Sequence, residues 1–126
     1  MKTTREQAMN DTELLSHDTA LNTLVRKGQI LEGLAEHFAE DCTFQEGNDE
    51  VIRGRATQSK RLEEMFAGLK SFDGATLHCQ ALGEGVTLTE WTFNMTAGNG
   101  DPIVWNEVLS RQWVDGKVVR ERYYQS

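Results

Sequence analysis

The spacing of apolar residues changes abruptly partway along the chain. Up to about residue 70, apolar side chains recur every three or four positions, which is typical of amphipathic helices. Beyond Asp73-Gly74 they alternate with polar residues, which is typical of half-buried strands. A run of helices followed by a run of strands predicts an α+β domain.

The first half of the chain predicts three helices. Asn10 and Glu13 form a capping-box pattern before a first helix over 12–26, and Gly28 is suited to end it. The polar residues 1–11 are expected to be a frayed N-terminal segment, so that the domain occupies 12–126. The other elements of this half are a helix over 29–39, a short strand over 42–45 and a helix over 55–69.

The second half predicts four strands, joined by short glycine-containing turns into an antiparallel meander. In the second of them, the apolar positions are even up to Leu88 and odd from Trp91 onwards, which predicts a β-bulge near Thr89-Glu90. Because a bulge curves a sheet, we expect the three helices to pack in a strongly curved, mostly antiparallel sheet, a cone-shaped α+β barrel. The predicted strands are 75–83, 86–97, 102–114 and 117–125.

The last hairpin, at Asp115-Gly116, allows two registers. A two-residue type I′ turn with a regular ladder would place Arg111 opposite Arg120, and like charges in that position are destabilising. A three-residue loop with a glycine bulge shifts the pairing by one residue and places Arg111 diagonal to Glu121. We therefore predict the second register.

One face of this hairpin mixes tryptophans with full charges. Such a face is too apolar for the exterior and too charged for a sealed core, so it predicts a ligand pocket at the open end of the sheet. Trp91 and His37 could line the same pocket from neighbouring elements, although core packing is an open alternative for each tryptophan. The predicted face carries Trp105, Glu107, Leu109, Arg111, Trp113, Glu121 and Tyr123.

Composition excludes several classes of partner. The net charge of −7 disfavours nucleic acid. There is no apolar run long enough to span a membrane and no signal-peptide pattern, so a cytoplasmic protein is expected. Cys42 and Cys79 are expected to be buried free thiols, and the three histidines lack metal-ligand spacing. No cofactor motif is present, so neither a metal nor a cofactor is expected.

Three short motifs carry a resemblance to a known superfamily. They are Phe38-Ala39-Glu40-Asp41 before a strand, Gly54 before the third helix, and Asp115-Gly116-Lys117-Val118 near the end. Over about 12–126 the chain resembles the nuclear transport factor 2-like superfamily, in its SnoaL-like and ketosteroid-isomerase-like branch. The resemblance implies the cone-shaped fold and a homodimer formed through the outer sheet face. The superfamily includes isomerases, cyclases, dehydratases, epoxide hydrolases and non-catalytic binding modules.

The resemblance also implies roles for particular residues. The general base of the isomerases matches Glu46, whereas the positions of their two oxyanion donors match Leu21 and Leu109. Because oxyanion donors supply much of that catalysis, steroid isomerisation is not expected. The acidic residue of the cyclase branch has two candidates, Glu107 and Glu121.

The predicted ligand is a small hydrophobic molecule with a polar group. An enzyme would use Glu46 or Glu107 to transfer a proton, Tyr123 to donate a hydrogen bond and Arg111 to orient an anionic group. Glu107, Arg111 and Glu121 imitate the Asp–Arg–Asp chemistry of the epoxide hydrolases, but not its spacing. Structural alternatives stay open: Glu46 as a loop residue, Glu107 bonded to Tyr123, and Arg111 paired with Glu121. The protein as a whole could instead be a non-catalytic ligand-binding or dimerisation module with a vestigial pocket.

Overall fold

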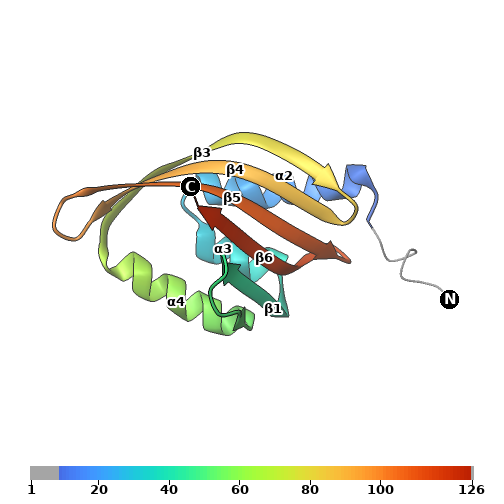
Figure 1. Cartoon of the computed structure of the whole chain (residues 1–126), viewed down its shortest axis with the longest axis horizontal. Coiled ribbons are helices and arrows are strands. Elements are labelled where there is room, and N and C mark those ends of the chain that lie inside the picture. The colour runs from blue at the N-terminus through green and yellow to red at the C-terminus, as the bar shows by residue number, and fades with distance from the viewer. Residues whose placement is uncertain (1–8, 126) are drawn as a thin grey trace.

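A computed structural model describes residues 9–125 of the chain (Figure 1). The predicted N-terminal segment therefore lies mostly outside the described residues. The elements are α2 (Asp11–Arg26), α3 (Ile30–His37), β1 (Phe38–Glu46), β2 (Ile52–Arg53), α4 (Arg55–Ala67), β3 (Leu69–Gly83), β4 (Val86–Ala97), β5 (Pro102–Val114) and β6 (Lys117–Gln125).

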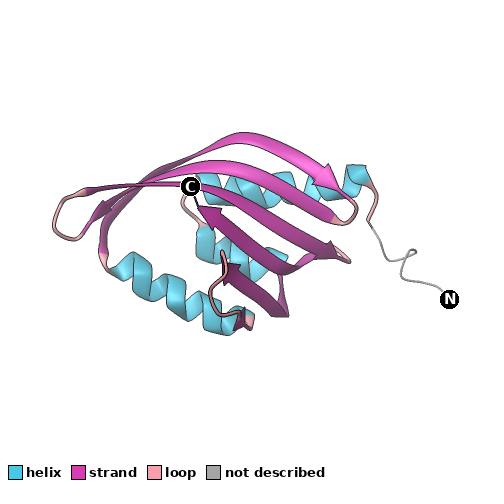
Figure 2. Cartoon of the chain, in the orientation of Figure 1, coloured by secondary structure: helices cyan, strands magenta, loops and turns pink. Residues whose placement is uncertain are grey.

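The strands form one six-stranded sheet in the order β2-β1-β6-β5-β4-β3. Among the strand pairs of residues 9–125, only β1–β6 is parallel, and the meander from β3 to β6 is antiparallel as predicted. The three helices lie on the concave side of the curved sheet (Figure 2). The α+β class and the cone-shaped arrangement of helices within a mostly antiparallel sheet are confirmed.

The helix boundaries follow the capping signals closely. The Asn10 side chain accepts a hydrogen bond from the Glu13 amide at 2.9 Å, and the Glu13 carboxylate accepts one from the Asn10 amide at 3.1 Å. The predicted capping box is thus present, and α2 begins one residue earlier than predicted. The strands β1 and β3 both begin earlier than predicted, at Phe38 and Leu69, because each continues almost directly from the preceding helix.

The bulge predicted near Thr89-Glu90 is wrong. β4 pairs with β5 without a register shift, and the shifts lie instead between β3 and β4. Thr87 and Thr89 are buried on the inner face while Leu88 is 42% exposed, so the inward positions are odd throughout. Each threonine hydroxyl accepts a hydrogen bond from a buried indole, that of Trp113 or Trp91. The prediction failed because it assumed that inward positions are apolar, whereas two inward positions of β4 carry threonine.

The predicted three-residue hairpin loop is also wrong. Asp115 and Gly116 have φ values of 51° and 80°, as a two-residue type I′ turn requires. The one-residue shift comes instead from Val119, which has no partner in the β5–β6 ladder. Beyond this bulge Arg111 lies directly opposite Glu121 rather than diagonal to it. The like-charge contact with Arg120 is avoided within the strand and not at the turn.

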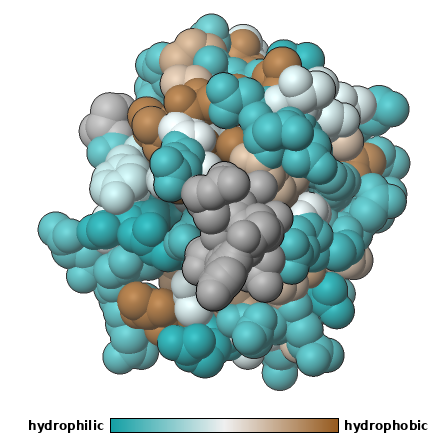
Figure 3. Space-filling view, turned by 90° about the vertical axis from the view of Figure 1, so that its right-hand side faces the viewer, coloured by the Kyte–Doolittle hydropathy of each residue, from teal (hydrophilic) through white to brown (hydrophobic). Residues whose placement is uncertain are grey.

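The core lies between the concave face of the sheet and the helices. At the end of the molecule seen in Figure 3, hydrophilic residues cover much of the surface and apolar residues form small patches. The buried apolar residues are Leu14, Leu21, Val25, Leu34, Phe38, Cys42, Phe44, Trp91, Phe93, Met95, Leu109, Trp113 and Val118. Cys79 is exposed, which corrects the expectation that both thiols are buried.

The hairpin geometry predicts a specific cost for one substitution. Gly116→Ala should lower the free energy of unfolding by about 1–2 kcal/mol, because a positive φ is unfavourable for a residue with a Cβ atom. The added Cβ would also lie 3.2 Å from the His17 ring. Urea denaturation measures the effect. Gly83→Ala is the matched control, since its Cβ would meet only ordinary contacts at 3.9 Å; equal effects of the two substitutions would contradict the assignment.

Candidate functional site

The structure encloses an apolar cavity between α2, α3, α4 and the concave face of the sheet. Its volume is about 130 Å³, and a more polar recess of about 290 Å³ adjoins it. The two share four lining residues: Phe44, Glu46, Gln58 and Tyr123. The inner wall is formed mainly by Leu21, Val25, Ile30, Leu34, Phe38, Leu62, Met65, Phe66, Phe72, Phe93 and Met95.

Most of the residues predicted for a pocket line this cavity. The lining includes the two acidic residues predicted to transfer a proton, and it also includes the predicted tyrosine and the predicted arginine–glutamate pair. Three other predicted residues lie elsewhere. Those that line it are Glu46, Trp105, Glu107, Leu109, Arg111, Glu121 and Tyr123.

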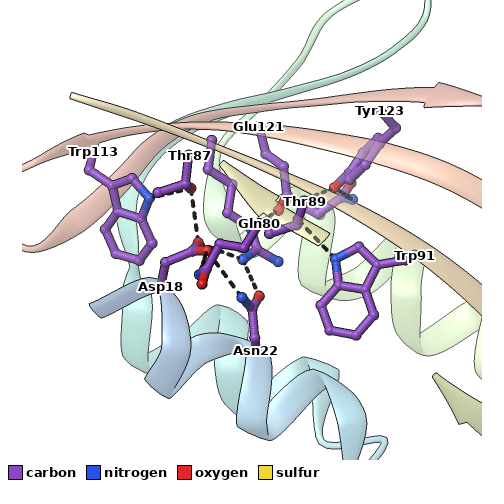
Figure 4. A network of polar contacts seen from close by, with 11 residues as sticks. Asp18, Asn22, Gln80, Thr87, Thr89, Trp91, Trp113, Glu121 and Tyr123 are labelled. Atoms are coloured by element: carbon purple, nitrogen blue, oxygen red, sulfur yellow. Dashed lines mark hydrogen bonds and ion pairs between the residues drawn. The ribbon is translucent and has the colours of Figure 1, made fainter. Parts of the chain in front are cut away.

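Trp91, Trp113 and His37 do not line the cavity, so the predicted contact with it is not made. The Trp91 indole is fully buried and donates to Thr89, and the Trp113 indole donates to Thr87 (Figure 4). His37 is buried outside the cavity, and its Nε2 lies 3.0 Å from a Glu36 carboxylate oxygen but has no hydrogen-bond partner of suitable geometry among residues 9–125. Burial lowers the pKa of His37, which favours a neutral imidazole in this position.

A buried arginine is among the residues that line the cavity. Arg111 is 1% exposed, and its Nε donates to Glu121 at 2.8 Å while its Nη1 donates to Asp18 at 2.9 Å. Nη1 also donates to the Asn22 side chain at 2.6 Å. The predicted structural alternative, in which Arg111 pairs with Glu121, is therefore present. The Asp18 carboxylate adds a second ion pair, so that Asp18, Arg111 and Glu121 form a charged triad.

Asp18 is a residue that sequence reasoning missed. Its two oxygens accept hydrogen bonds from Asn22, Gln80, Thr87 and Arg111, and the residue is fully buried. Figure 4 shows these partners converging from the helix and from neighbouring strands. A signal was available in the sequence, because Asp18 interrupts the apolar stripe of the first helix at a position that faces the core.

Glu121 also connects the triad to the cavity rim. Its second oxygen accepts a hydrogen bond from the Tyr123 hydroxyl at 2.6 Å, and that hydroxyl accepts one from Gln58 of α4 at 3.3 Å. Burial and the adjacent Glu121 carboxylate raise the pKa of Tyr123 well above its usual value, so the phenol stays protonated. Gln58, like Asp18, is a polar residue in an apolar helical stripe, and the sequence analysis did not identify it.

Glu107 lies apart from this network. Its carboxylate accepts a hydrogen bond from Gln125 at 2.9 Å and not from Tyr123, which rules out the expected pairing with the tyrosine. Burial raises the pKa of Glu107, and the charges of Glu46 and Glu121 add to this effect. Within residues 9–125, neither Glu107 nor Glu46 forms an ion pair. Glu46 is the last residue of β1 and is exposed, so it stands at the entrance of the cavity.

The acidic, histidine and thiol groups in the described part of the chain also bear on metal binding and nucleophilic chemistry. No group of three or more histidine, cysteine or acidic residues there could hold a metal ion. None of the helices over residues 9–125 is both long and apolar enough to cross a bilayer. Burial raises the pKa of the Cys42 thiol to about 11, which disfavours a reactive thiolate.

The triad predicts a large and charge-specific effect on stability. Arg111→Met should lower the free energy of unfolding at neutral pH by about 3–5 kcal/mol, because it leaves two buried carboxylates without their cation. Chemical denaturation at pH 7 measures this loss. Arg120→Met, on the exposed side of the neighbouring strand, should change stability by less than about 0.5 kcal/mol. Similar effects of the two substitutions would contradict the structural role of the triad.

Solved structures share this architecture at low sequence identity. A provisionally assigned SnoaL-like polyketide cyclase from Mesorhizobium loti has a TM-score of 0.78 at 16% identity, covering 88% of this chain and 97% of that one. An NTF2-like protein of unknown function from Burkholderia pseudomallei has a TM-score of 0.78 at 11% identity, covering 94% and 92%. An LEH-like epoxide hydrolase from M. tuberculosis has a TM-score of 0.74 at 17% identity, covering 91% and 84%.

At such identities the structural similarity shows the fold alone. No curated protein matches the sequence. The family model described as the SnoaL-like domain matches residues 19–121, which include Arg111, Glu107 and most of the cavity wall. The match extends over most of the chain, and the protein belongs to the SnoaL-like domain family.

Proposed function

We propose that this protein binds a small, largely hydrophobic carbonyl compound in the cavity and catalyses cofactor-free proton transfer on it. Glu107 is the general base and acid. The observation that carries this proposal is a half-buried carboxylate with a raised pKa, facing an apolar cavity and free of any ion pair within the described residues. Isomerisation, cyclisation and dehydration of carbonyl compounds all depend on such a transfer.

The cavity supports a ligand of limited size. At about 130 Å³ it is comparable to cavities of roughly 150 Å³ that hold a single benzene ring. A larger molecule would extend past Glu46 and Tyr123 into the adjoining recess, because these residues line both spaces. The predominantly apolar wall favours a hydrophobic body, and the polar groups lie where they would orient one functional group.

The environment of Glu107 suits proton transfer at carbon. A base is most effective when its pKa approaches the working pH, and burial moves the pKa of Glu107 in that direction. Glu46 is exposed at the entrance, so it is the weaker candidate for the base. The structural neighbours named as a polyketide cyclase and an epoxide hydrolase are consistent with acid–base chemistry in this fold.

Epoxide hydrolysis is less well supported than carbonyl chemistry. Asp18, Arg111 and Glu121 have the carboxylate–arginine–carboxylate composition implied by the resemblance to epoxide hydrolases. However, Asp18 does not line the cavity, and its oxygens already accept hydrogen bonds from four side chains. Its carboxylate is therefore not placed to transfer a proton to a ligand.

Proton exchange into small ketones tests the proposal. Incubated in D₂O with a panel of cyclic and aryl ketones, the protein should accelerate exchange of hydrogens α to the carbonyl, followed by NMR. Glu107→Gln should reduce the rate by about 10²–10⁴-fold, because the amide cannot accept the proton. The rate should fall as the pH is lowered through the pKa of Glu107, with a midpoint above the ordinary value of 4.5, since only the ionised carboxylate acts as base.

Glu63→Gln is the matched control for this experiment. Glu63 is exposed on α4 and lies outside the cavity, so its replacement should leave exchange unchanged. Exchange that persists in the Glu107→Gln variant, or that is lost equally in both variants, would contradict the assignment of the base.

A second candidate function is a dimerisation module, because apolar residues lie exposed on the outer sheet face. Val104, Val108 and Tyr124 are 57%, 37% and 43% exposed, and Val108 lies directly opposite Tyr124 in the β5–β6 ladder. A second copy of the chain would cover this surface. In this alternative the cavity is vestigial, and the outer face performs the function.

Sedimentation velocity tests this dimer. The unmodified chain should sediment as a dimer at micromolar concentration, and Val108→Arg should shift it to the monomer, since a desolvated charge would oppose association. Val51→Arg is the control, because Val51 is 48% exposed in the loop before β2 and away from this face. A monomeric unmodified chain, or equal dissociation by both variants, would rule out the interface.

A further inference from the structure

Arg111 has one nitrogen that the charged triad does not use. Its Nε and Nη1 donate to Glu121, Asp18 and Asn22, whereas Nη2 has no hydrogen-bond partner among residues 9–125. Arg111 is 99% buried, yet it lines the apolar cavity. Nη2 is not among the fully buried side-chain atoms that lack a partner, which within residues 9–125 are limited to His37 Nε2, so it keeps some accessible surface and can donate to another molecule. Arg111 therefore lines the cavity with one donor nitrogen that a ligand acceptor atom could use.

The charges around this donor determine which acceptor suits it. The single positive charge of Arg111 is already opposed by Asp18 and Glu121, at 2.9 and 2.8 Å. Glu46 and Glu107 line the same cavity and have no ion-pair partner within the described chain. The formal charges of the lining residues are thus mostly negative, and this balance would oppose an anionic ligand even though an arginine is present. This is contrary to the expectation that Arg111 orients an anionic group.

We infer that Arg111 donates a hydrogen bond from Nη2 to the oxygen of an uncharged carbonyl ligand, and that the site selects ketones or aldehydes over carboxylates. This inference rests on the proposed function and specifies its ligand class. The positions that match the oxyanion donors of the isomerases carry Leu21 and Leu109, which cannot donate. Arg111 supplies a donor from the same face of β5, two residues beyond Leu109.

The donor has a definite role in the proposed reaction. When Glu107 takes a proton from the carbon next to the carbonyl, the electrons of the C–H bond form a carbon–carbon double bond. The π electrons of the carbonyl move onto its oxygen, which becomes an enolate oxygen. Nη2 would stabilise that developing charge, and return of the proton from Glu107 to carbon restores the carbonyl. The two side chains lie four residues apart on one face of β5, so they approach a bound ligand from different positions along the strand.

Three probes of similar size separate the possible ligand classes: acetophenone, benzoate and ethylbenzene. Calorimetric titration should rank acetophenone first, about tenfold or more above ethylbenzene, because a hydrogen bond from a charged donor is gained. Benzoate should bind most weakly. In addition, the carbonyl stretching frequency of bound acetophenone should lie below its value in hexane, since a charged donor polarises the C=O bond.

Variants must remove the donor without leaving buried charges. Arg111→Met alone would leave two buried carboxylates without their cation, so the test uses the combined change Asp18→Asn, Arg111→Met and Glu121→Gln, which neutralises the whole triad. This variant should bind acetophenone and ethylbenzene equally and should lose the shift in carbonyl frequency. Arg120→Met is the control and should behave as the unmodified protein. If the combined variant does not fold, the carbonyl frequency of acetophenone bound to the unmodified protein still shows whether a charged donor contacts the carbonyl oxygen.

The outcomes separate this inference from the proposed function. Benzoate binding as tightly as acetophenone, an unshifted carbonyl frequency, or a ketone preference retained in the neutral variant would each overturn the role of Arg111. In those cases hydrophobic binding in the cavity, and with it the proposed function, would stand. Failure of all three probes to bind would overturn the proposed function itself and this inference with it.

Discussion

The buried charge of Arg111 is the interaction on which the rest of the structure depends. Removing a guanidinium group from water costs several kcal/mol, and Asp18 and Glu121 compensate for it only in a precise geometry. The compensation links α2, β5 and β6, and Gln80 and Thr87 extend it to β3 and β4. A single charged group thereby ties the first helix to the meander across most of the sheet.

The need to pair buried polar groups explains two places where the strands depart from a simple alternation of inward apolar and outward polar residues. Thr87 and Thr89 occupy inward positions that apolar residues would otherwise fill, and their hydroxyls accept from the buried indoles of Trp113 and Trp91. Val119 forms a bulge that brings Glu121, and not Arg120, opposite Arg111. In both cases satisfaction of buried polar groups determines the local strand structure, because an unsatisfied buried group costs more than a bulge.

The same network divides the acidic residues of the site into two kinds. Asp18 and Glu121 each accept hydrogen bonds from more than one side chain, so their positions are structural. Glu107 has one amide partner and faces the apolar cavity, where burial raises its pKa. The proposed proton transfer and the structural support would thus fall to different carboxylates. Arg111 keeps one nitrogen, Nη2, without a partner in the described chain, and the proposed ligand of this donor is a neutral carbonyl compound.

Local features of the sequence by themselves determined the order of elements, the capping box at Asn10, the antiparallel meander and the mixed inward face of β5. Each depends on neighbours along the chain, through helical or strand periodicity, and can therefore be deduced from it. Only the tertiary structure decided the partners of Asp18, the position of the bulge at Val119 and the exclusion of Trp91 and Trp113 from the cavity. These depend on which polar groups meet across elements far apart in sequence, where the cost of leaving a buried charge or donor unpaired outweighs local preference.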